Sequence, residues 1–261
     1  MTGAPPRVSV VTVALNSGAH IGDAIRSVLA QTYPSIEYTI VDGGSTDGTV
    51  DVIREYESRL AAWISEPDHG IADAFNKGLA RTSGDYILFL NSDDWLVDPE
   101  AVSKAMEAAV KSAYPEVVFG DCEIVDRDSG RPLRRLSMGW SPRAFRLGRM
   151  INHPALFTHR AYFEKYGTFD TSYRIAMDFE LLLRGVFQSR VVHLPRLLTN
   201  MRSGGLSMRN RERVVGEIVR ALKKNGFIRT RWGEHCVRGY FALRGVLRPL
   251  RLCANRILGR R

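Results

Sequence analysis

The sequence predicts an α/β fold with a mostly parallel sheet, and two features of its first hundred residues indicate this. Short apolar runs typical of buried strands alternate with segments whose apolar residues recur every three or four positions, as on one face of a helix. Polar segments follow three of the apolar runs, where a parallel sheet presents the carboxyl ends of its strands. Ligands of open α/β sheets bind at that edge, so these polar segments are the first candidates for a site.

Each predicted element follows from its own residues. Residues 8–13 form a largely apolar run that predicts a buried strand, and residues 21–29 then keep helical spacing. Between residues 126 and 150 the pattern weakens among Gly, Pro and Arg, so we expect irregular structure there. Further strands are predicted at residues 38–41, 61–64, 86–90 and 116–125, and further helices at 50–56, 71–79, 99–112 and about 178–187.

The size and composition of the chain indicate one catalytic domain with an appendage. Of the 261 residues, 44% are hydrophobic and 25% are charged, which suffices for one substantial core. We place the catalytic domain at residues 1–210 and a basic, helical extension at residues 211–261. We expect neither a secretory signal nor an apolar stretch long enough to cross a bilayer. Three cysteines far apart in the chain predict no disulfide framework, which favours a cytoplasmic location.

Charge is distributed unevenly along the chain. Residues 201–261 contain 16 Lys and Arg against 3 Asp and Glu, whereas residues 1–200 contain 21 against 25. A basic tail suits an anionic lipid surface, near which each basic side chain contributes roughly 1 kcal/mol. We therefore expect peripheral association with the inner face of the cell membrane and no nucleic-acid partner. The alternatives are a solvated tail, a tail packed on the catalytic domain, or a non-enzymatic protein whose tail binds nucleic acid.

Two adjacent carboxylates end the polar segment that follows the run 86–90. Asp93 and Asp94 come after Asn91 and Ser92, directly beyond a strand predicted to be buried. Carboxylates this close repel each other unless a cation lies between them, and Mg²⁺ or Mn²⁺ accepts one or two carboxylates together with water and ligand phosphates. The segment therefore predicts a metal site for a nucleoside diphosphate. The alternative is that Asp93 or Asp94 is the N-cap of the helix expected near residue 99.

A glycine-rich segment begins at Asp42, after the run 38–41. The Asp42 carboxylate is placed to accept a hydrogen bond from a nucleobase ring N–H, which uracil, thymine and guanine all present; the alternative is an ordinary turn into the next helix. This segment has no G-x-G-x-x-G motif, so a dinucleotide site and hydride transfer are not supported. Nucleotidyl transfer is an alternative that calls for a Gly-rich basic loop after the first strand, and residues 15–20 contain neither Lys nor Arg.

In their order and spacing, these segments resemble family 2 glycosyltransferases of the GT-A fold, most of all bacterial enzymes of exopolysaccharide and glycolipid assembly. The resemblance covers about residues 7–205 and is carried by residues 12–16, 42–49, 68–78, 84–94 and the segment around Asp178. It implies a Rossmann-like nucleotide-binding half with a mostly parallel sheet and an acceptor-binding half. It also implies inverting, metal-dependent transfer of a sugar from a nucleoside-diphosphate donor to a lipid-linked or polysaccharide acceptor.

The resemblance also assigns roles to residues at the edge of the predicted sheet. It implies that Asp42 contacts the nucleobase, that Asp93 lies near the ribose, and that Asp94 ligates the metal that bridges the diphosphate. The other candidates for the donor pocket at this edge are Thr12, Asn16 and Ser92.

A second group of donor-site candidates lies on the helix predicted at residues 71–79. In the family's pattern Asp73, Asn76 and Lys77 sit beside the donor, and Arg81 follows one turn later. The alternative is that these residues form the polar face of an amphipathic surface helix.

Asp178 is the predicted general base. Inverting transfer needs a carboxylate opposite the leaving diphosphate to take the proton of the attacking hydroxyl. Relatives carry a second acid two residues further on, where this chain has Glu180, so Glu180 is the alternative base. A third interpretation is that Asp178 merely caps the helix that follows it.

Two further segments are candidates for contact with a substrate. His153 stands where relatives carry His, which predicts a role toward donor or acceptor; the alternative is a structural histidine. The paired glycines Gly204 and Gly205 predict either a simple turn or a loop that closes over the diphosphate.

Overall fold

The computed structural model describes residues 4–243. Its strands are β1 (Val8–Ala14), β2 (Ile36–Asp42), β3 (Ala62–Ser65), β4 (Tyr86–Asn91), β5 (Asp94–Leu96), β6 (Val117–Val125), β7 (Pro132–Leu136), β8 (Leu156–His159) and β9 (Val191–Arg202). Its helices are α1 (Ile21–Leu29), α2 (Thr49–Glu55), α3 (Ile71–Leu79), α4 (Ala101–Lys111), α5 (Pro142–Arg146), α6 (Arg160–Tyr166), α7 (Met177–Leu183), α8 (Leu206–Arg209) and α9 (Arg211–Lys224). Three short 3-10 turns are η1 (Glu57–Arg59), η2 (His153–Ala155) and η3 (Val186–Gln188).

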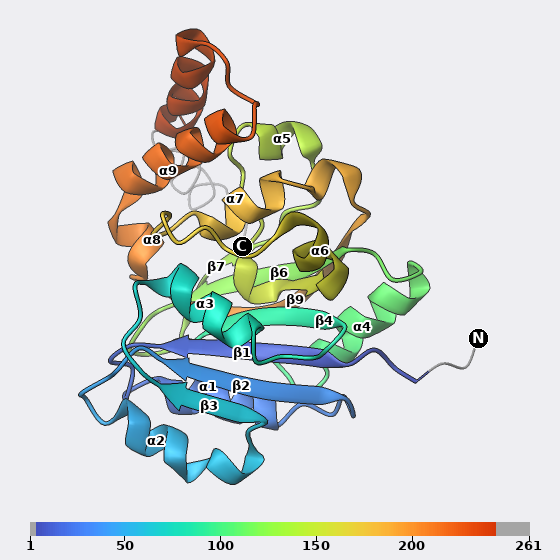
Figure 1. Cartoon of the computed structure of the whole chain (residues 1–261), viewed down its shortest axis with the longest axis vertical. Helices are drawn as coiled ribbons and strands as arrows, with labels where there is room; N and C mark the ends of the chain where they lie inside the picture. The colour runs from blue at the N-terminus through green and yellow to red at the C-terminus, as the bar shows by residue number, and fades with distance from the viewer. Residues whose placement is uncertain (1–3, 244–261) are drawn as a thin grey trace, which may run out of the picture.

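Within these residues, nine strands form one sheet in the order β3-β2-β1-β4-β8-β6-β9-β5, with β7 paired to β6 (Figure 1). Strands β3, β2, β1 and β4 run parallel, and so do β6 and β9. Strand β8 is antiparallel to both β4 and β6 and joins the two parallel groups. The predicted mostly parallel α/β fold is therefore confirmed.

Side-chain alternation along the buried strands builds a core on each face of the sheet. In β1, Val11 and Val13 join the core formed with α3, α6, α7 and α9. Val8 and Val10 point the other way, into the core formed with α1 and α4. A strand buried on both faces has to be apolar at successive positions, which is why residues 8–13 read as a largely apolar run.

The predicted elements up to residue 125 are found within one or two residues of their expected bounds, for example β3 at Ala62–Ser65 and α4 at Ala101–Lys111. The expectation of irregular structure between residues 126 and 150 is wrong for two segments and holds for the residues around them. Strand β7 pairs with β6 as an edge strand, and α5 begins at Pro142 after the N-cap Ser141. Arg134 and Arg135 in β7 dilute the apolar alternation that a sequence pattern needs, because an edge strand is only partly buried.

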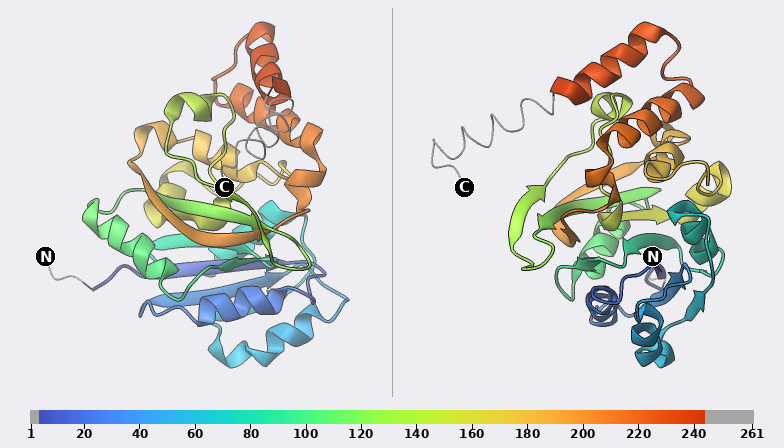
Figure 2. Two further views of the ribbon diagram at one scale, coloured as in Figure 1. Left: turned by 180° about the vertical axis from the view of Figure 1, so that it is seen from behind. Right: turned by 90° about the vertical axis from the view of Figure 1, so that its left-hand side faces the viewer.

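The basic extension packs on the rest of the protein as far as the structure describes it. Helix α9 buries Ile218, Val219 and Leu222 in the same core as α7. Residues 231–243 are helical, with Val237 buried, and both views of Figure 2 place this helix and α9 at the opposite end from α1 and α2. Residues 244–261, which include part of the predicted membrane-binding tail, lie outside the described residues. The boundary at residue 210 stays a prediction.

Parallel pairing brings the polar segments together. Strands β1, β2 and β3 end on the same side of the sheet, as their arrowheads show in Figure 1. Asn91 at the end of β4 pairs in register with Val13 near the end of β1, so the segments after these strands are neighbours. Within residues 4–243, none of the helices combines the length and apolar character needed to span a bilayer.

Candidate active site

A cavity of about 570 Å³ opens beyond the carboxyl ends of β1 and β4. Its wall is completed by the starts of α3 and α7 and by residues 201–209, which follow from the end of β9. The sequence-predicted site residues that line it are Asn16, Ser92, Asp93, Asp94, His153 and Asp178. The structure therefore brings the predicted metal ligand, Asp94, and the predicted general base, Asp178, into one cavity, although 83 residues lie between them in the sequence.

The other predicted site residues lie outside the lining of this cavity, and several have structural partners. Thr12 is buried and its hydroxyl accepts a hydrogen bond from Tyr38 at 2.9 Å. The Asn76 side chain both donates to the carbonyl of Phe169 and accepts from its amide, at 2.9 Å each. Such a pair of hydrogen bonds anchors the loop before α7 to α3, and it occupies the amide that was expected to face the donor.

The charged residues in α3 and just after it bind neighbouring protein groups and do not line the cavity. Lys77 donates to the carbonyl of Pro67 at 2.8 Å and pairs with Glu66 at 3.0 Å and Asp73 at 3.5 Å. Arg81 donates to the carbonyl of Lys77. In this structure, these contacts match the alternative of a polar helix face, and the donor roles of Asp73, Lys77 and Arg81 stay predictions.

The Asp42 carboxylate organises its own loop. One oxygen accepts hydrogen bonds from the amides of Gly44 at 3.1 Å and Ser45 at 2.9 Å and from the hydroxyl of Ser65 at 2.7 Å. Gly44 has a φ of +85°, which favours glycine, and a Cβ on Gly43 would approach Asp68 to 2.3 Å. Asp42 is thus fully buried at the root of a tight turn, and its contact with a nucleobase stays a prediction.

The neighbouring Asp93 and Asp94 lie in different surroundings. Asp94 begins β5 and is buried, and it accepts a hydrogen bond from Asn91 at 2.9 Å. Burial, and then the nearby charge of Asp93, raise the pKa of Asp94 well above its ordinary value. Asp93 instead pairs with Arg127 at 2.7 Å. The alternative that either residue caps the next helix is wrong, because α4 begins only at Ala101 with Glu100 as its N-cap.

Three arginines line the same cavity, and the sequence analysis did not single them out as site residues. Arg127 binds Asp93, and Arg202 at the end of β9 donates to the backbone carbonyl of Asp93 at 3.1 Å. Arg209 reaches the lining from α8, beyond Gly204 and Gly205. Arg127 is far in the sequence from Arg202 and Arg209, so no single local motif contains all three. Together they concentrate positive charge where an anionic ligand would lie.

The residues present fit a divalent cation at Asp94. No group of three or more His, Cys, Asp and Glu within residues 4–243 is arranged to hold a metal ion. Mg²⁺ and Mn²⁺ sites that bind nucleotides need no such group, because one or two protein carboxylates are completed by ligand phosphates and water. Asp94 is a carboxylate that faces the cavity and whose charged form is disfavoured by its surroundings alone. A cation would stabilise that charged form.

Asp178 lies in the first turn of α7, and its side chain faces the cavity. The N-cap of this helix is Ala176, so the interpretation of Asp178 as the helix cap is not supported, although one Asp178 oxygen accepts from the amide of Phe179 at 2.7 Å. Burial raises the pKa of Asp178 to about 7. A carboxylate with this pKa can gain and release a proton near neutral pH, as a general base requires.

A neutral histidine and an amide connect Asp178 with Asp94. The side-chain nitrogen of Asn91 lies 2.9 Å from Oδ2 of Asp94 and 3.0 Å from Nε2 of His153. Burial lowers the pKa of His153 to about 4, so the ring is neutral at pH 7. Because an amide nitrogen only donates, the His153 proton is on Nδ1, the atom 3.8 Å from Oδ2 of Asp178.

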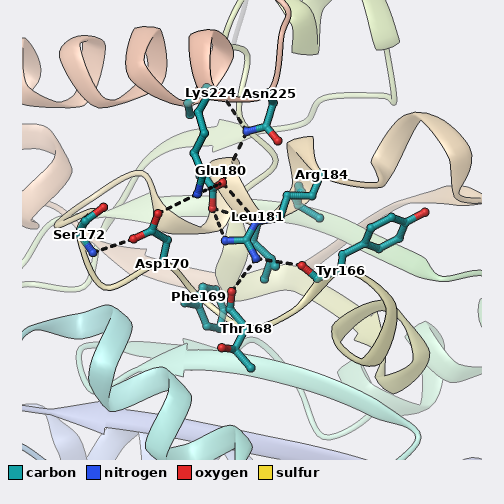
Figure 3. Close-up of polar contacts among 12 residues, drawn as sticks. Tyr166, Thr168, Phe169, Asp170, Ser172, Glu180, Leu181, Arg184, Lys224 and Asn225 are labelled. Atoms are coloured by element: carbon teal, nitrogen blue, oxygen red, sulfur yellow. Dashed lines mark hydrogen bonds and ion pairs between the residues drawn. The ribbon is translucent and has the colours of Figure 1, made fainter.

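Glu180, the alternative base, lies outside the cavity lining and is wholly buried in a cluster of polar contacts (Figure 3). Arg184 donates to both of its oxygens, and Lys224 of α9 pairs with it at 2.9 Å. Burial by itself would raise the pKa of Glu180, but the hydrogen bonds from Arg184 and Lys224 hold it below its ordinary value. The contacts therefore favour a structural role for Glu180.

Replacing Glu180 by Gln tests this distinction. We expect Glu180→Gln to lower the free energy of unfolding by roughly 3 kcal/mol, because it leaves the Arg184 guanidinium without its counter-charge and removes one of the two carboxylates that pair with Lys224. The catalytic rate of the folded protein should change by less than about threefold. Urea unfolding and single-turnover transfer measure the two effects. Loss of turnover at unchanged stability would instead identify Glu180 as the base.

Comparisons with known proteins agree with this arrangement. The family model described as Glycosyl transferase family 2 matches residues 9–182. An uncharacterized glycosyltransferase of Mycobacterium tuberculosis is 34% identical over 84% of this chain and 84% of its own length. A PGL/p-HBAD biosynthesis glycosyltransferase of Mycobacterium bovis is 28% identical over 69% of this chain and 70% of its own. A putative teichuronic acid biosynthesis glycosyltransferase of Bacillus subtilis is 44% identical, over 38% of this chain and 40% of its own.

Solved structures show the same fold at low sequence identity. Staphylococcus aureus TarS, residues 1–349 in complex with UDP-GlcNAc, has a TM-score of 0.67 and 19% identity; the match covers 83% of this chain and 66% of that one. A mannosyltransferase of Pyrobaculum calidifontis in complex with GDP-Man and Mn²⁺ has a TM-score of 0.64 and 18% identity, over 98% of this chain and 81% of that one. The predicted GT-A fold is thereby confirmed, and the chain belongs to glycosyl transferase family 2.

Proposed function

We propose that this glycosyltransferase transfers a sugar, with inversion, from a nucleoside-diphosphate sugar to an acceptor hydroxyl, with Asp178 as general base. The observation that carries the proposal is the cavity itself. It places a buried carboxyl whose pKa is about 7 in the same space as the Asp93 and Asp94 carboxylates and three arginines. Membership in the family decides against nucleotidyl transfer and against a protein without enzymatic activity.

The donor side of the cavity is the region of Asp94 and the arginines. Arg127, Arg202 and Arg209 offer positive charge to a diphosphate in a body that is otherwise acidic. When bound at Asp94, Mg²⁺ or Mn²⁺ would offset the negative charge of the leaving diphosphate. The complexes of two structural neighbours with UDP-GlcNAc and with GDP-Man and Mn²⁺ support a donor and a cation of these classes.

The reaction then follows from the two sides of the cavity. Asp178 accepts the proton of the acceptor hydroxyl as its oxygen forms a bond to the anomeric carbon. The bond from that carbon to the donor phosphate breaks, and the electron pair leaves with the nucleoside diphosphate. Arg127 and Arg202 stabilise the charge that develops on the leaving group. Attack from the face opposite the leaving group inverts the configuration of the anomeric carbon.

The acceptor we propose is a lipid-linked or polysaccharide acceptor. Leu15, Leu206 and Met208 all line the cavity while remaining 56%, 47% and 41% exposed. Apolar side chains exposed at the rim of a polar site suit an acceptor that carries an apolar group. The names of relatives in PGL/p-HBAD biosynthesis and in teichuronic acid biosynthesis support this class of acceptor.

A screen of nucleotide sugars tests the proposed function. UDP, GDP and dTDP sugars are incubated with the protein, with Mn²⁺ or EDTA, and the released nucleoside diphosphate is quantified. We expect release from at least one donor, and only with the cation. Absence of hydrolysis, of transfer and of thermal stabilisation by every donor would overturn the proposal.

Membrane association is proposed from the basic extension and is tested by truncation. Trp232 is 78% exposed beside the exposed Arg231 in the helix at residues 231–243, and residues 244–261 add six arginines without an acidic residue. Deleting residues 244–261 should release the enzyme from anionic vesicles and leave nucleotide binding intact, because each basic side chain near such a surface contributes about 1 kcal/mol. Cosedimentation measures the release.

The truncation point avoids the core. A cut after Asn225 would also remove Ile228 and Val237, which are buried. Neutral vesicles and high salt are the controls, since electrostatic adhesion depends on both. Equal sedimentation of the full-length and truncated proteins with anionic vesicles would show that residues 244–261 are not the anchor.

A further inference from the structure

A side chain from α9 holds the turn that leads into α7. The Glu217 carboxylate is buried and accepts hydrogen bonds from three successive amides, those of Arg174 at 3.1 Å, Ile175 at 2.9 Å and Ala176 at 2.9 Å. Helix starts leave amide groups without partners inside the helix, and α7 has no side-chain cap of its own. The Glu217 carboxylate, from another element outside the segment matched by the family model, binds the amide of the N-cap Ala176 and the two amides before it.

The turn held by Glu217 belongs to the wall of the cavity. Ile175, Met177 and Asp178 all line it. Asp178 is two residues beyond Ala176, the last of the three residues whose amides Glu217 binds. Since the backbone of this turn sets the start of α7, its position determines where the Asp178 carboxylate lies in the cavity.

Helix α9 also contacts residues before and after Asp178. Before it, Arg220 donates to the carbonyl of Ser172 at 2.9 Å and lies over the ring of Tyr173 at 3.7 Å. After it, Lys224 pairs with Glu180 at 2.9 Å, as Figure 3 shows. Ala176, which Glu217 binds, and Glu180, which Lys224 binds, are each two residues from Asp178, but of the two only the Glu217 contact is made to the backbone. It is therefore the contact that acts most directly on the base.

We propose that Glu217 is a positioning residue for sugar transfer, which holds the 174–176 turn so that Asp178 meets the acceptor hydroxyl. The inference rests on the proposed function, in which Asp178 takes the proton of that hydroxyl. A carboxylate suits the task because both of its oxygens only accept. A glutamine keeps one accepting oxygen and sets an NH₂ group among backbone donors.

Substitution of Glu217 should act on the rate and leave the donor site alone. We expect Glu217→Ala to lower kcat by about 10- to 100-fold, because a displacement of about 1 Å in a reacting group can cost a hundredfold. Glu217→Gln should keep an intermediate rate. The KM for the nucleotide sugar should stay within about twofold, because Asp94 and the arginines belong to other elements. The matched control is Glu212→Ala, an exposed acid in the first turn of the same helix, which should transfer at the wild-type rate.

Hydrogen exchange gives a readout that does not depend on transfer. In Glu217→Gln, a variant that retains a hydrogen-bonding side chain if the alanine variant fails to fold, the amides of residues 174–176 should exchange at least about tenfold faster than in wild type. Unchanged exchange of these amides, or a rate of transfer equal to wild type in both Glu217 variants, would overturn the inference. So would a parallel loss of nucleotide affinity, which indicates general damage.

Measuring Asp178→Asn beside these variants separates the two proposals. A wild-type rate in Asp178→Asn refutes the assignment of the base, whatever Glu217 does. A slow Asp178→Asn together with fast Glu217 variants leaves the base in place and refutes the positioning role.

Discussion

Asp178→Asn should fold, bind nucleotide and cation, and transfer sugar at least about a hundredfold more slowly than wild type. A positioned general base contributes typically 10²- to 10⁴-fold, and asparagine keeps the shape of the side chain while it removes the basic oxygen pair. The amide oxygen of asparagine can still accept from the amide of Phe179. Single-turnover transfer rates measure the loss of the chemical step without a contribution from product release.

The pH dependence of transfer tests the same assignment. The pKa of Asp178 is raised to about 7 by burial, and a general base acts in its deprotonated form. The transfer rate should therefore rise with pH through about 7 and level off above it. This rising limb of the pH–rate profile should be absent from the residual activity of Asp178→Asn. A cation bound nearby would move the limb to lower pH, because positive charge favours the carboxylate.

The pKa of Asp178 also predicts the direction in which Asp178→Asn changes the stability of the protein. Because the folded-state pKa of Asp178 is raised, its contribution to stability is present in full below its ordinary pKa of 3.8 and is lost as the pH rises through about 7. Asparagine stays neutral at every pH. The variant should then melt at the same temperature as wild type or higher when the pH is above about 7. A large loss of stability there would indicate a structural role and would contradict the assignment.

The second large effect is expected at Asp94. Removing the cation with EDTA, or replacing Asp94 by Asn in the presence of Mn²⁺, should weaken the binding of the nucleoside diphosphate at least about tenfold and reduce transfer at least about a hundredfold. The buried Asp94 carboxylate is the protein group that best fits a cation in this cavity. Without a bound cation, the negative charge of Asp93, next to Asp94, repels a diphosphate. Calorimetric titration of UDP, GDP and dTDP measures the affinities.

The control for Asp94→Asn is its stability in the absence of the cation. Asparagine at position 94 still accepts the hydrogen bond that Asn91 donates, and it removes a buried charge that the protein disfavours. The melting temperature without cation should therefore not fall. Equal nucleotide affinity with and without the cation, for every nucleotide that binds, would remove the metal from the mechanism.

Local pattern was enough to predict most strands and helices up to residue 125, because the central strands there are buried on both faces; beyond it, β7, β8 and β9 were not predicted. Residues 8–13 and 86–90 are apolar for this reason, and they became β1 and β4 within one or two residues. Strand β7 was missed because only its pairing with β6 defines it, and its two arginines, the partly buried Arg134 and the exposed Arg135, interrupt the apolar alternation. Edge strands depend on their neighbour more than on their own composition.

The residues of the candidate site likewise fall into those that the sequence predicts and those that it does not. Asp93 and Asp94 were predicted from a short motif and Asp178 from the family resemblance, and the fold brings all three to one cavity. Arg127 and Arg202 were not predicted, because an arginine in a basic chain carries no local signal of its destination. Asn76 and Glu180 stand at positions that suggested chemistry, yet each is bound to groups outside the cavity lining.

By itself, then, the sequence determined most strands and helices up to residue 125 and the acidic residues at the ends of the strands, because hydrophobic period and strand-end polarity are local properties. Tertiary structure alone decided which of the two acids of α7 faces the cavity, since residues 178 and 180 differ in direction around the helix and Lys224 and Arg184 reach only the second. It also decided that Glu217 of the basic extension supports the turn before Asp178. Contacts between distant segments depend on how helices pack on the sheet, and no window of the sequence contains both partners.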